Sequence, residues 1–233
     1  MKSAIIGITI LIVITVAIVW LNRQWIHKFS HNSQEKYTVS ERNKAYSENM
    51  PGMNKYKYFC SDGGPFILIT SEIRDKWGGV ENMFNPLDPK TDYGKACGII
   101  SSAEGDFGII NSRKSEALVV DAPMLAMEQT NKDEVLDIYL LKEWHTNDMD
   151  SMIEKCQKDV ENKPFENTGK TIEFKTDEVT FMYAGDVYGE FAYNFSNFKI
   201  QKGKYELLKF EWENQKLGKI TVLKLISETL KQS

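Results

Sequence analysis

Side chains that commonly carry out catalysis are sparse in this chain of 233 residues. His145 is the only histidine beyond residue 54, so a metal site with several imidazoles, or a Ser-His or Cys-His nucleophile, would depend on this one residue. A single histidine directly after a tryptophan is more typical of a surface or strand-edge position. The sequence also contains no G-x-S-x-G, H-E-x-x-H or P-loop motif. We therefore expect a protein that is not an enzyme and that has no metal site and no cofactor.

Acidic side chains gather between a predicted strand and a predicted helix, at Glu143, Asp148 and Asp150. Paired carboxylates can perform acid–base chemistry, but acidic residues at a helix start are also expected from the helix dipole alone. Loops of this kind commonly present binding residues, and opposite charge would speed the capture of a cationic partner. These three residues are our candidate partner-binding residues, with a solvated acidic loop as the alternative.

The stretch "FCSDGGPFILITSEIRDKWGG", residues 59–79, contains two diglycines and raises the question of a ligand-binding loop. A phosphate-binding glycine loop requires a strand before it and a helix directly after it, so that the helix N-terminus meets the anion. Here a strand at 66–69 follows the first diglycine, and the predicted helix at 71–77 starts only after that strand. The order argues against a phosphate site, and we predict no small-molecule ligand.

We interpret Gly63, Gly64 and Pro65 as a turn between two strands. Glycine supplies a positive φ or a close approach at a turn, and proline is tolerated as the first residue of a strand. Trp77, at the end of the short helical pattern, is predicted to anchor the core. All four residues are therefore assigned structural roles.

The cysteines and the charge balance exclude two further classes of site. Cys60, Cys97 and Cys156 are too widely separated for a metal knuckle; they are either buried apolar residues or, in an exported domain, one disulfide with one thiol left over. The chain has 29 basic and 33 acidic residues and a formal net charge of −4. It shows no basic patch that would indicate nucleic acid, and its acidic balance suits a cationic partner.

The N-terminal residues 4–21, "AIIGITILIVITVAIVWL", carry no charge. As a helix this run would reach about 27 Å, close to the hydrocarbon thickness of a bilayer. A cleaved signal peptide is the alternative, but the run exceeds the usual apolar region and no small-residue cleavage site follows. The positive-inside count is nearly balanced, whereas the two-residue tail before the run is typical of a signal anchor. We predict a transmembrane anchor at 1–21 in the bacterial inner membrane, with the C-terminal domain in the periplasm.

The remainder divides into a polar stalk and one domain. Residues 22–54 are rich in polar residues and end at Pro51 and Gly52, so we place the globular domain at 55–233. Alternating and short apolar runs predict mostly strands, and "EVLDIYLLKEW" fits a strand while leaving a helix open. The pattern "DMDSMIEKCQKDV" predicts a helix, and a hairpin is predicted over 214–218. The fold class is α+β, with a mainly antiparallel sheet and a few short helices.

Four motifs follow one another along the chain: "SDGGPFILI", W-G-G after the short helical segment, "DYGKACGI" and "GDFGIINSRKSEALVVDAP". Together they show a resemblance to the immunity protein 21 family of bacterial polymorphic toxin systems. It is clearest over 58–123 and continues weakly to "GKYELLKFEW", while the anchor and stalk depart from the usual soluble form. The resemblance implies an α+β protein that binds and neutralises a cognate toxin, without catalytic residues.

Two function classes remain open at this point. One is a membrane-anchored toxin inhibitor, whose tether concentrates it where the toxin arrives. The other is a non-catalytic docking or sensory subunit of a cell-envelope complex, and an envelope hydrolase ranks third. A toxin gene directly beside this one would favour the inhibitor, because a neutralising protein is normally made with its target.

Overall fold

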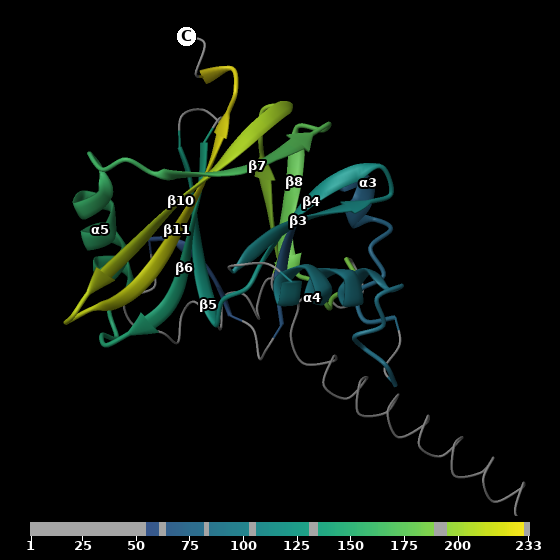
Figure 1. The fold of residues 1–233 in the computed structure, drawn as a ribbon, viewed down its shortest axis with the longest axis horizontal. Helices are drawn as coiled ribbons and strands as arrows, with labels where there is room; N and C mark the ends of the chain where they lie inside the picture. Colours follow the sequence, from purple (N-terminus) through teal and green to yellow (C-terminus); the bar gives the residue numbers. More distant parts are fainter. Residues whose placement is uncertain are drawn as a thin grey trace, which may run out of the picture. The chain divides into compact units, whose positions relative to one another are not determined.

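The computed structural model describes residues 55–60, 64–81, 84–102, 106–130, 135–188 and 195–230. The predicted anchor (1–21), the stalk (22–54) and Gly63 lie outside the described residues. Two antiparallel sheets pack face to face, with short helices against their outer faces (Figure 1). The predicted α+β class with mainly antiparallel sheets and few short helices is confirmed. No helix among the described residues is long and apolar enough to cross a membrane.

The larger sheet has six strands in the order β1-β5-β6-β11-β10-β7, all paired antiparallel. The predicted hairpin forms between β10 and β11, where Asn214 faces Gly218 across the turn. The segment "EVLDIYLLKEW", whose pattern fitted a strand but left a helix open, forms the strand β6, which pairs with β5 on one side and β11 on the other. The strands are β1 (Lys57–Cys60), β5 (Met124–Thr130), β6 (Val135–Trp144), β7 (Glu166–Phe174), β10 (Gly203–Asn214) and β11 (Gly218–Ser227).

The smaller sheet has five strands in the order β3-β4-β2-β8-β9, again antiparallel. The two-residue turn between β3 and β4 places Arg113 and Lys114 at φ 51° and 71°. Positive φ at both central residues matches the twist of the flanking strands, as a tight hairpin requires. The strands are β2 (Phe66–Thr70), β3 (Phe107–Ser112), β4 (Ser115–Val120), β8 (Glu178–Tyr183) and β9 (Phe195–Lys199).

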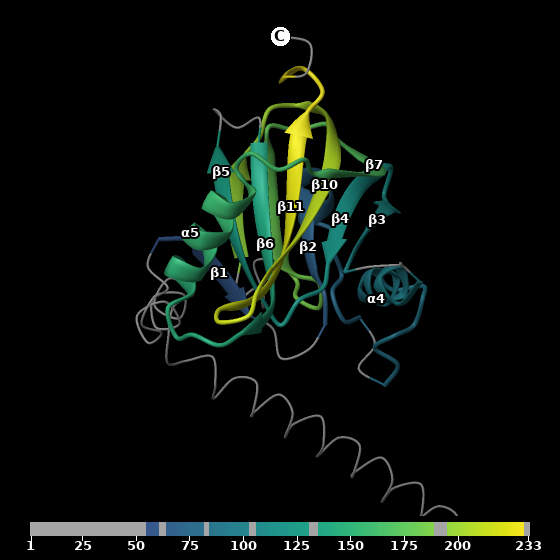
Figure 2. The same cartoon turned by 60° about the vertical axis from the view of Figure 1, so that its left-hand side comes forward.

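In the described part of the chain, three helices lie against the outer faces of the sheets (Figures 1 and 2). The amphipathic helix α5 (Met149–Val160) lies against the larger sheet, where its buried side chains join those of Tyr139 and Trp212. The helices α3 (Ser71–Arg74) and α4 (Asp92–Ser102) lie against the smaller sheet together with Trp77. Each sheet is therefore buried on both faces over much of its area.

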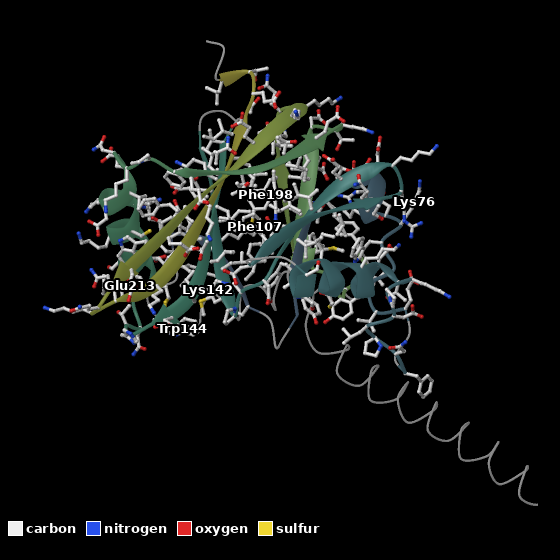
Figure 3. The ribbon with its side chains drawn as sticks, in the orientation of Figure 1. Lys76, Phe107, Lys142, Trp144, Phe198 and Glu213 are labelled. Atoms are coloured by element: carbon white, nitrogen blue, oxygen red, sulfur yellow. The ribbon has the colours of Figure 1, made fainter. Side chains whose placement is uncertain are left out.

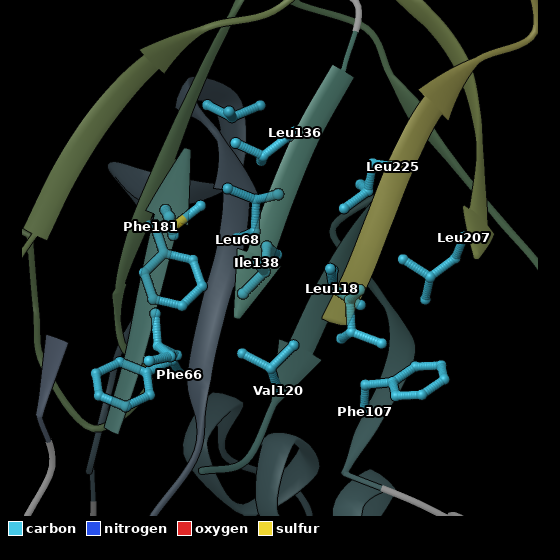
Figure 4. Packing of buried hydrophobic residues seen from close by; sticks show 14 of the residues in the cluster. Phe66, Leu68, Phe107, Leu118, Val120, Leu136, Ile138, Phe181, Leu207 and Leu225 are labelled. Carbon is cyan, nitrogen blue, oxygen red and sulfur yellow. The ribbon is translucent and has the colours of Figure 1, made fainter. Parts of the chain in front are cut away.

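The main core fills the space between the two sheets (Figure 4). In β6, Leu136 and Ile138 point into this core, whereas Tyr139 and Leu141 point to the α5 side. A strand buried on both faces carries a nearly continuous apolar run, and such a run shows little alternation. The labelled core residues come from both sheets: Phe66, Leu68, Phe107, Leu118, Val120, Leu136, Ile138, Phe181, Leu207 and Leu225.

Some predicted elements differ from the structure. The helix predicted over 71–77 ends at Arg74, and tight turns with Lys76 N donating to Ile73 O (2.9 Å) and Trp77 N to Arg74 O (3.2 Å) follow. These turns carry the Trp77 side chain into the core, where 1% of its surface stays exposed. The sequence patterns also missed α4, β5 and β9.

Candidate partner-binding surface

The exposed end of β6 begins at a β-bulge. Ile220 of β11 faces Leu141, but Lys219 faces Glu143, so Lys142 is the additional residue in β6. A bulge interrupts the alternation of side chains and re-aims those that follow. The strand is buried up to Leu141 and exposed at Glu143 and beyond. The bulge therefore separates the buried part of β6 from its exposed end.

Lys142 connects the exposed end of β6 to the residues that flank the β3–β4 hairpin. Its Nζ donates to the carbonyl of Asp121 at 2.9 Å and pairs with the carboxylate of Asp106 at 2.6 Å. Across the ladder, Gly218 has φ +128°, and a Cβ there would lie 2.0 Å from the carbonyl oxygen of Glu143. Only glycine allows β11 to approach the end of β6 so closely.

An exposed tryptophan lies beside acidic side chains at this end of the sheet. Trp144 is 38% exposed, and Figure 3 shows it at the same end of the larger sheet as Glu213. Lys219 Nζ lies 3.2 Å from the Glu143 carboxylate and 3.7 Å from that of Glu213. His145 is exposed, and its backbone N–H donates to Leu217 O at 3.0 Å. This bond extends the pairing of β6 and β11 by one residue beyond Trp144.

Asp148 caps the N-terminus of α5. Its Oδ1 accepts from the Ser151 backbone N–H at 3.0 Å, and its Oδ2 accepts from the Ser151 hydroxyl at 2.7 Å. Both bonds favour the ionised form, and they lower the pKa of the Asp148 carboxyl. The side chain is exposed, so its charge still faces solvent. Asp148 is therefore both a helix cap and a fixed negative charge.

Asp150 connects α5 to the first strand. Its Oδ1 accepts from the Tyr58 hydroxyl at 2.8 Å, and its Oδ2 accepts from the backbone N–H of Lys55 at 3.0 Å. The Asp150 carboxylate thereby fixes the start of α5 against the chain at β1. We call Glu143, Trp144, His145, Asp148 and Asp150 together the β6–α5 surface. It presents fixed negative charge and one partly exposed aromatic side chain.

The residues around the first diglycine have close contacts within the protein. Gly64 has φ +123°, and a Cβ there would lie 2.5 Å from the Tyr93 hydroxyl and 2.7 Å from the Tyr183 hydroxyl. Those hydroxyls are 3.1 Å apart. Pro65 is buried, and its carbonyl accepts from the backbone N–H of Ala184 at 2.9 Å. The turn is thus packed against tyrosines and the chain after β8.

No family model, curated protein or solved structure matches the chain.

Side chains that could bind a metal ion, and the three thiols, also lie in the described part of the chain. Among the described residues, no group of three or more His, Cys, Asp or Glu side chains is placed to hold a metal ion. No disulfide joins Cys60, Cys97 and Cys156, all of which are described. Cys156 is buried between α5 and the larger sheet, and burial raises the pKa of its thiol to about 12. Of the two alternatives predicted for the cysteines, Cys156 is therefore a buried apolar residue and not part of a disulfide.

Three large apolar side chains are exposed among the described residues, and the sequence patterns did not single them out. These are Phe84, Leu87 and Trp144. The signal was present in "FNPLDPK" and "LKEW", where an apolar residue lies among loop-forming or charged residues. Exposed apolar side chains gathered in a patch mark interaction sites, whereas single ones are common on protein surfaces.

Proposed function

We propose that this protein is a membrane-anchored immunity protein that binds and neutralises a cognate bacterial toxin without catalysis. The β6–α5 surface carries the proposal, because it combines an exposed tryptophan with acidic side chains on a strand end and a capped helix. Tryptophan is enriched among residues that dominate binding energy. The resemblance of residues 58–123 to the immunity protein 21 family supports the same conclusion.

The β6–α5 surface is preorganised for binding. Ser151 holds the Asp148 carboxylate, while Tyr58 and the Lys55 backbone hold that of Asp150. Side chains already fixed in one geometry lose little conformational entropy on association. Fixed negative charge also attracts a cationic partner over distances of about a Debye length, roughly 10 Å at 0.1 M salt. A basic face of the toxin is therefore the partner chemistry that fits this surface.

The membrane anchor belongs to the proposal as well. Residues 1–21 span the inner membrane, residues 22–54 form the stalk, and the domain acts in the periplasm, where an incoming toxin would arrive. Retention of the protein in membranes through a carbonate wash, and activity of a periplasmic reporter fused after Ser233, test the anchor and its orientation. Activity of a cytoplasmic reporter instead would place the domain on the other side.

Neutralising the three acidic side chains tests the binding surface. The variant Glu143→Gln/Asp148→Ser/Asp150→Asn removes three charges while keeping a helix cap at 148 and an acceptor at 150. We expect toxin association at low salt to slow by about tenfold or more, because electrostatic steering acts chiefly on the association rate. Surface plasmon resonance with the toxin encoded beside this gene measures the rate.

A matched control separates local from overall charge. The variant with Glu161, Glu166 and Glu173 changed to Gln has the same net charge but alters exposed residues at the other end of α5 and on β7. It should bind the toxin at the wild-type rate. Equal slowing by both variants would mean that total charge, and not the β6–α5 surface, governs association.

Stoichiometry distinguishes inhibition from catalysis. Protection of a toxin-expressing cell should follow the molar ratio of the two proteins and be complete near one copy per toxin. Full protection far below that ratio, or its loss in a well-folded His145→Ala protein, would indicate an enzyme. Binding to other envelope proteins with no effect on any toxin would favour the docking or sensory subunit.

A further inference from the structure

The loop between α3 and α4 presents two large apolar side chains to solvent. The Phe84 side chain is fully exposed and that of Leu87 is 62% exposed, more than any other large apolar side chain among the described residues. Both belong to the segment "FNPLDPK", residues 84–90, which we call the Phe84 loop. The loop carries one acidic and one basic side chain, Asp88 and Lys90.

Hydrogen bonds hold the Phe84 loop in a defined turn. The backbone N–H of Asp88 donates to Asn85 O at 3.1 Å, and its carboxylate accepts from the Lys90 backbone N–H at 2.9 Å. The Asp88 carbonyl accepts from the backbone N–H and the hydroxyl of Thr91, at 2.9 Å and 2.8 Å. Backbone hydrogen bonds, together with those of the Asp88 carboxylate and the Thr91 hydroxyl, therefore fix the chain from Asn85 to Thr91.

The Phe84 loop is also attached to the first turn of α4. The Thr91 hydroxyl accepts from the Gly94 backbone N–H at 3.0 Å and so caps the helix. A Cβ at position 94 would lie 1.9 Å from the Asp88 carbonyl oxygen, so the loop backbone packs directly on the helix. Helix and loop form one unit that projects Leu87 outward.

We propose that the Phe84 loop inserts Phe84 and Leu87 into the interfacial layer of the bilayer that holds the N-terminal anchor. The inference depends on the anchor proposed above, because that anchor would hold the domain near the bilayer. Residues 4–21 are uncharged and long enough to span a bilayer, and residues 22–54 join them to Lys55. A tether of this length keeps the domain at an effective concentration on the order of millimolar near the membrane. Two apolar side chains then suffice for contact, although they would not recruit an untethered protein.

The composition of the loop favours lipid over a protein partner. Phe and Leu are the residues that amphipathic interfacial segments bury among the acyl chains, and the loop has no net charge to oppose a lipid surface. Leu is under-represented among the residues that dominate protein–protein binding. Contact with the membrane would leave the β6–α5 surface as the separate site for the toxin.

Photocrosslinking in the full-length protein tests the inference. Benzoylphenylalanine replaces Phe84 in one protein and Leu87 in a second. In a third protein, the matched control, it replaces Lys202, an exposed residue before β10. After irradiation of intact membranes, mass spectrometry identifies the adducts. We expect several-fold more lipid adduct at 84 and 87 than at 202, with all three proteins retained through a carbonate wash.

The other outcomes separate the membrane contact from the anchor and from toxin binding. Protein adducts at 84 and 87, or as little lipid adduct there as at 202, would overturn the membrane contact while leaving the anchor and toxin binding intact. Release by carbonate would overturn the anchor, and this inference with it. Loss of toxin protection in a Phe84→Ser/Leu87→Ser protein that still binds purified toxin would agree with membrane contact. Loss of binding in solution would assign the loop to the toxin interface.

Discussion

The indole nitrogen of Trp77 donates a hydrogen bond to the backbone carbonyl of Ala184, 2.8 Å away. The donor follows α3 and the acceptor follows β8, more than 100 positions later in the chain. The ring itself is buried with Ile67, Ile73 and Met182 against the outer face of the smaller sheet. One side chain thus fixes the loop between α3 and α4 to the sheet.

Truncating this side chain should destabilise the fold strongly. We expect Trp77→Ala to lower the free energy of unfolding by about 3–5 kcal/mol, because a large buried ring leaves a cavity. Trp77→Phe retains most of the packing but leaves the Ala184 carbonyl without its donor, at a cost of about 1–3 kcal/mol. Urea unfolding followed by near-ultraviolet circular dichroism measures both. Equal losses for the two variants would show that packing contributes little.

A side chain at position 64 should also destabilise the domain. Gly64→Val forces a β-branched residue to φ +123° and places its Cβ against the hydroxyls of Tyr93 and Tyr183. We expect a loss of one to a few kcal/mol, about the cost of a strained backbone position. Thermal unfolding measures it.

Gly98 supplies the control for that substitution. It lies within α4 with nothing within 4 Å of a Cβ, so Gly98→Ala should raise stability by about 0.5–1 kcal/mol. If Gly64→Val leaves the melting temperature unchanged but abolishes partner binding, the turn is a binding site and its structural interpretation is wrong.

The cap of α5 should depend on the oxygen atoms of Asp148 more than on its charge. Asp148→Ala removes both acceptors for Ser151 and should lower the melting temperature, whereas Asp148→Ser keeps one and should stay close to wild type. The pKa of Asp148 is lowered in the fold, so the contribution of its charge is present at neutral pH and is lost as pH falls through that lowered pKa. Melting curves at neutral and strongly acidic pH measure both effects; a serine variant as unstable as alanine would contradict the cap.

Asp137 should make the domain more stable at mildly acidic pH than at neutral pH. Its carboxylate is buried in β6, directly across the ladder from Glu128 of β5 and Lys224 of β11. Lys224 Nζ is 3.5 Å away, too far for a strong hydrogen bond, and burial raises the pKa of Asp137 to about 6. Ionisation therefore costs more in the folded state than in the unfolded state, where the pKa is near 3.8.

The sign of the pH dependence follows from that difference. The folded state binds the proton more tightly, so the contribution of Asp137 is fully present below pH 3.8 and is lost as pH rises through about 6. We expect Asp137→Asn to flatten the stability profile between those values. Lys224→Met should steepen the loss, because it removes the compensating cation. Melting temperatures in a pH series measure the profiles; an Asp137→Asn protein with the wild-type profile would exclude this carboxylate as the cause.

The sequence by itself determined the elements whose signal is local. The apolar spacing Met149, Met152, Ile153 and Cys156 forms the buried stripe of α5, since helix periodicity depends only on neighbouring turns. The hairpins β3–β4 and β10–β11 could be predicted because their strands are consecutive and joined by short turns. The acidic residues before α5 were placed near a helix start for the same local reason.

Only the tertiary structure decided the elements whose partners are distant. Leu136 and Leu140 left β6 ambiguous between helix and strand, and pairing with β11 more than 70 positions later resolves it. The glycines of α4 weaken its helical pattern, yet Thr91 caps it and Asp92 accepts from Gly78 N at 3.1 Å and from Arg113 Nη2 at 3.2 Å. The strand β5 also pairs with β1, which lies more than 60 positions earlier in the chain.

The composition of the candidate surface was visible in the sequence, but its geometry was not. Glu143, Asp148 and Asp150 could be selected from charge and from their position between two elements. Their bonds to Lys219, Ser151 and Tyr58, and the exposure of Trp144, depend on a bulge at Lys142 and on Gly218 of another strand. Register and bulges arise from pairing between segments far apart in the chain, so local preference could not specify which side chains reach solvent.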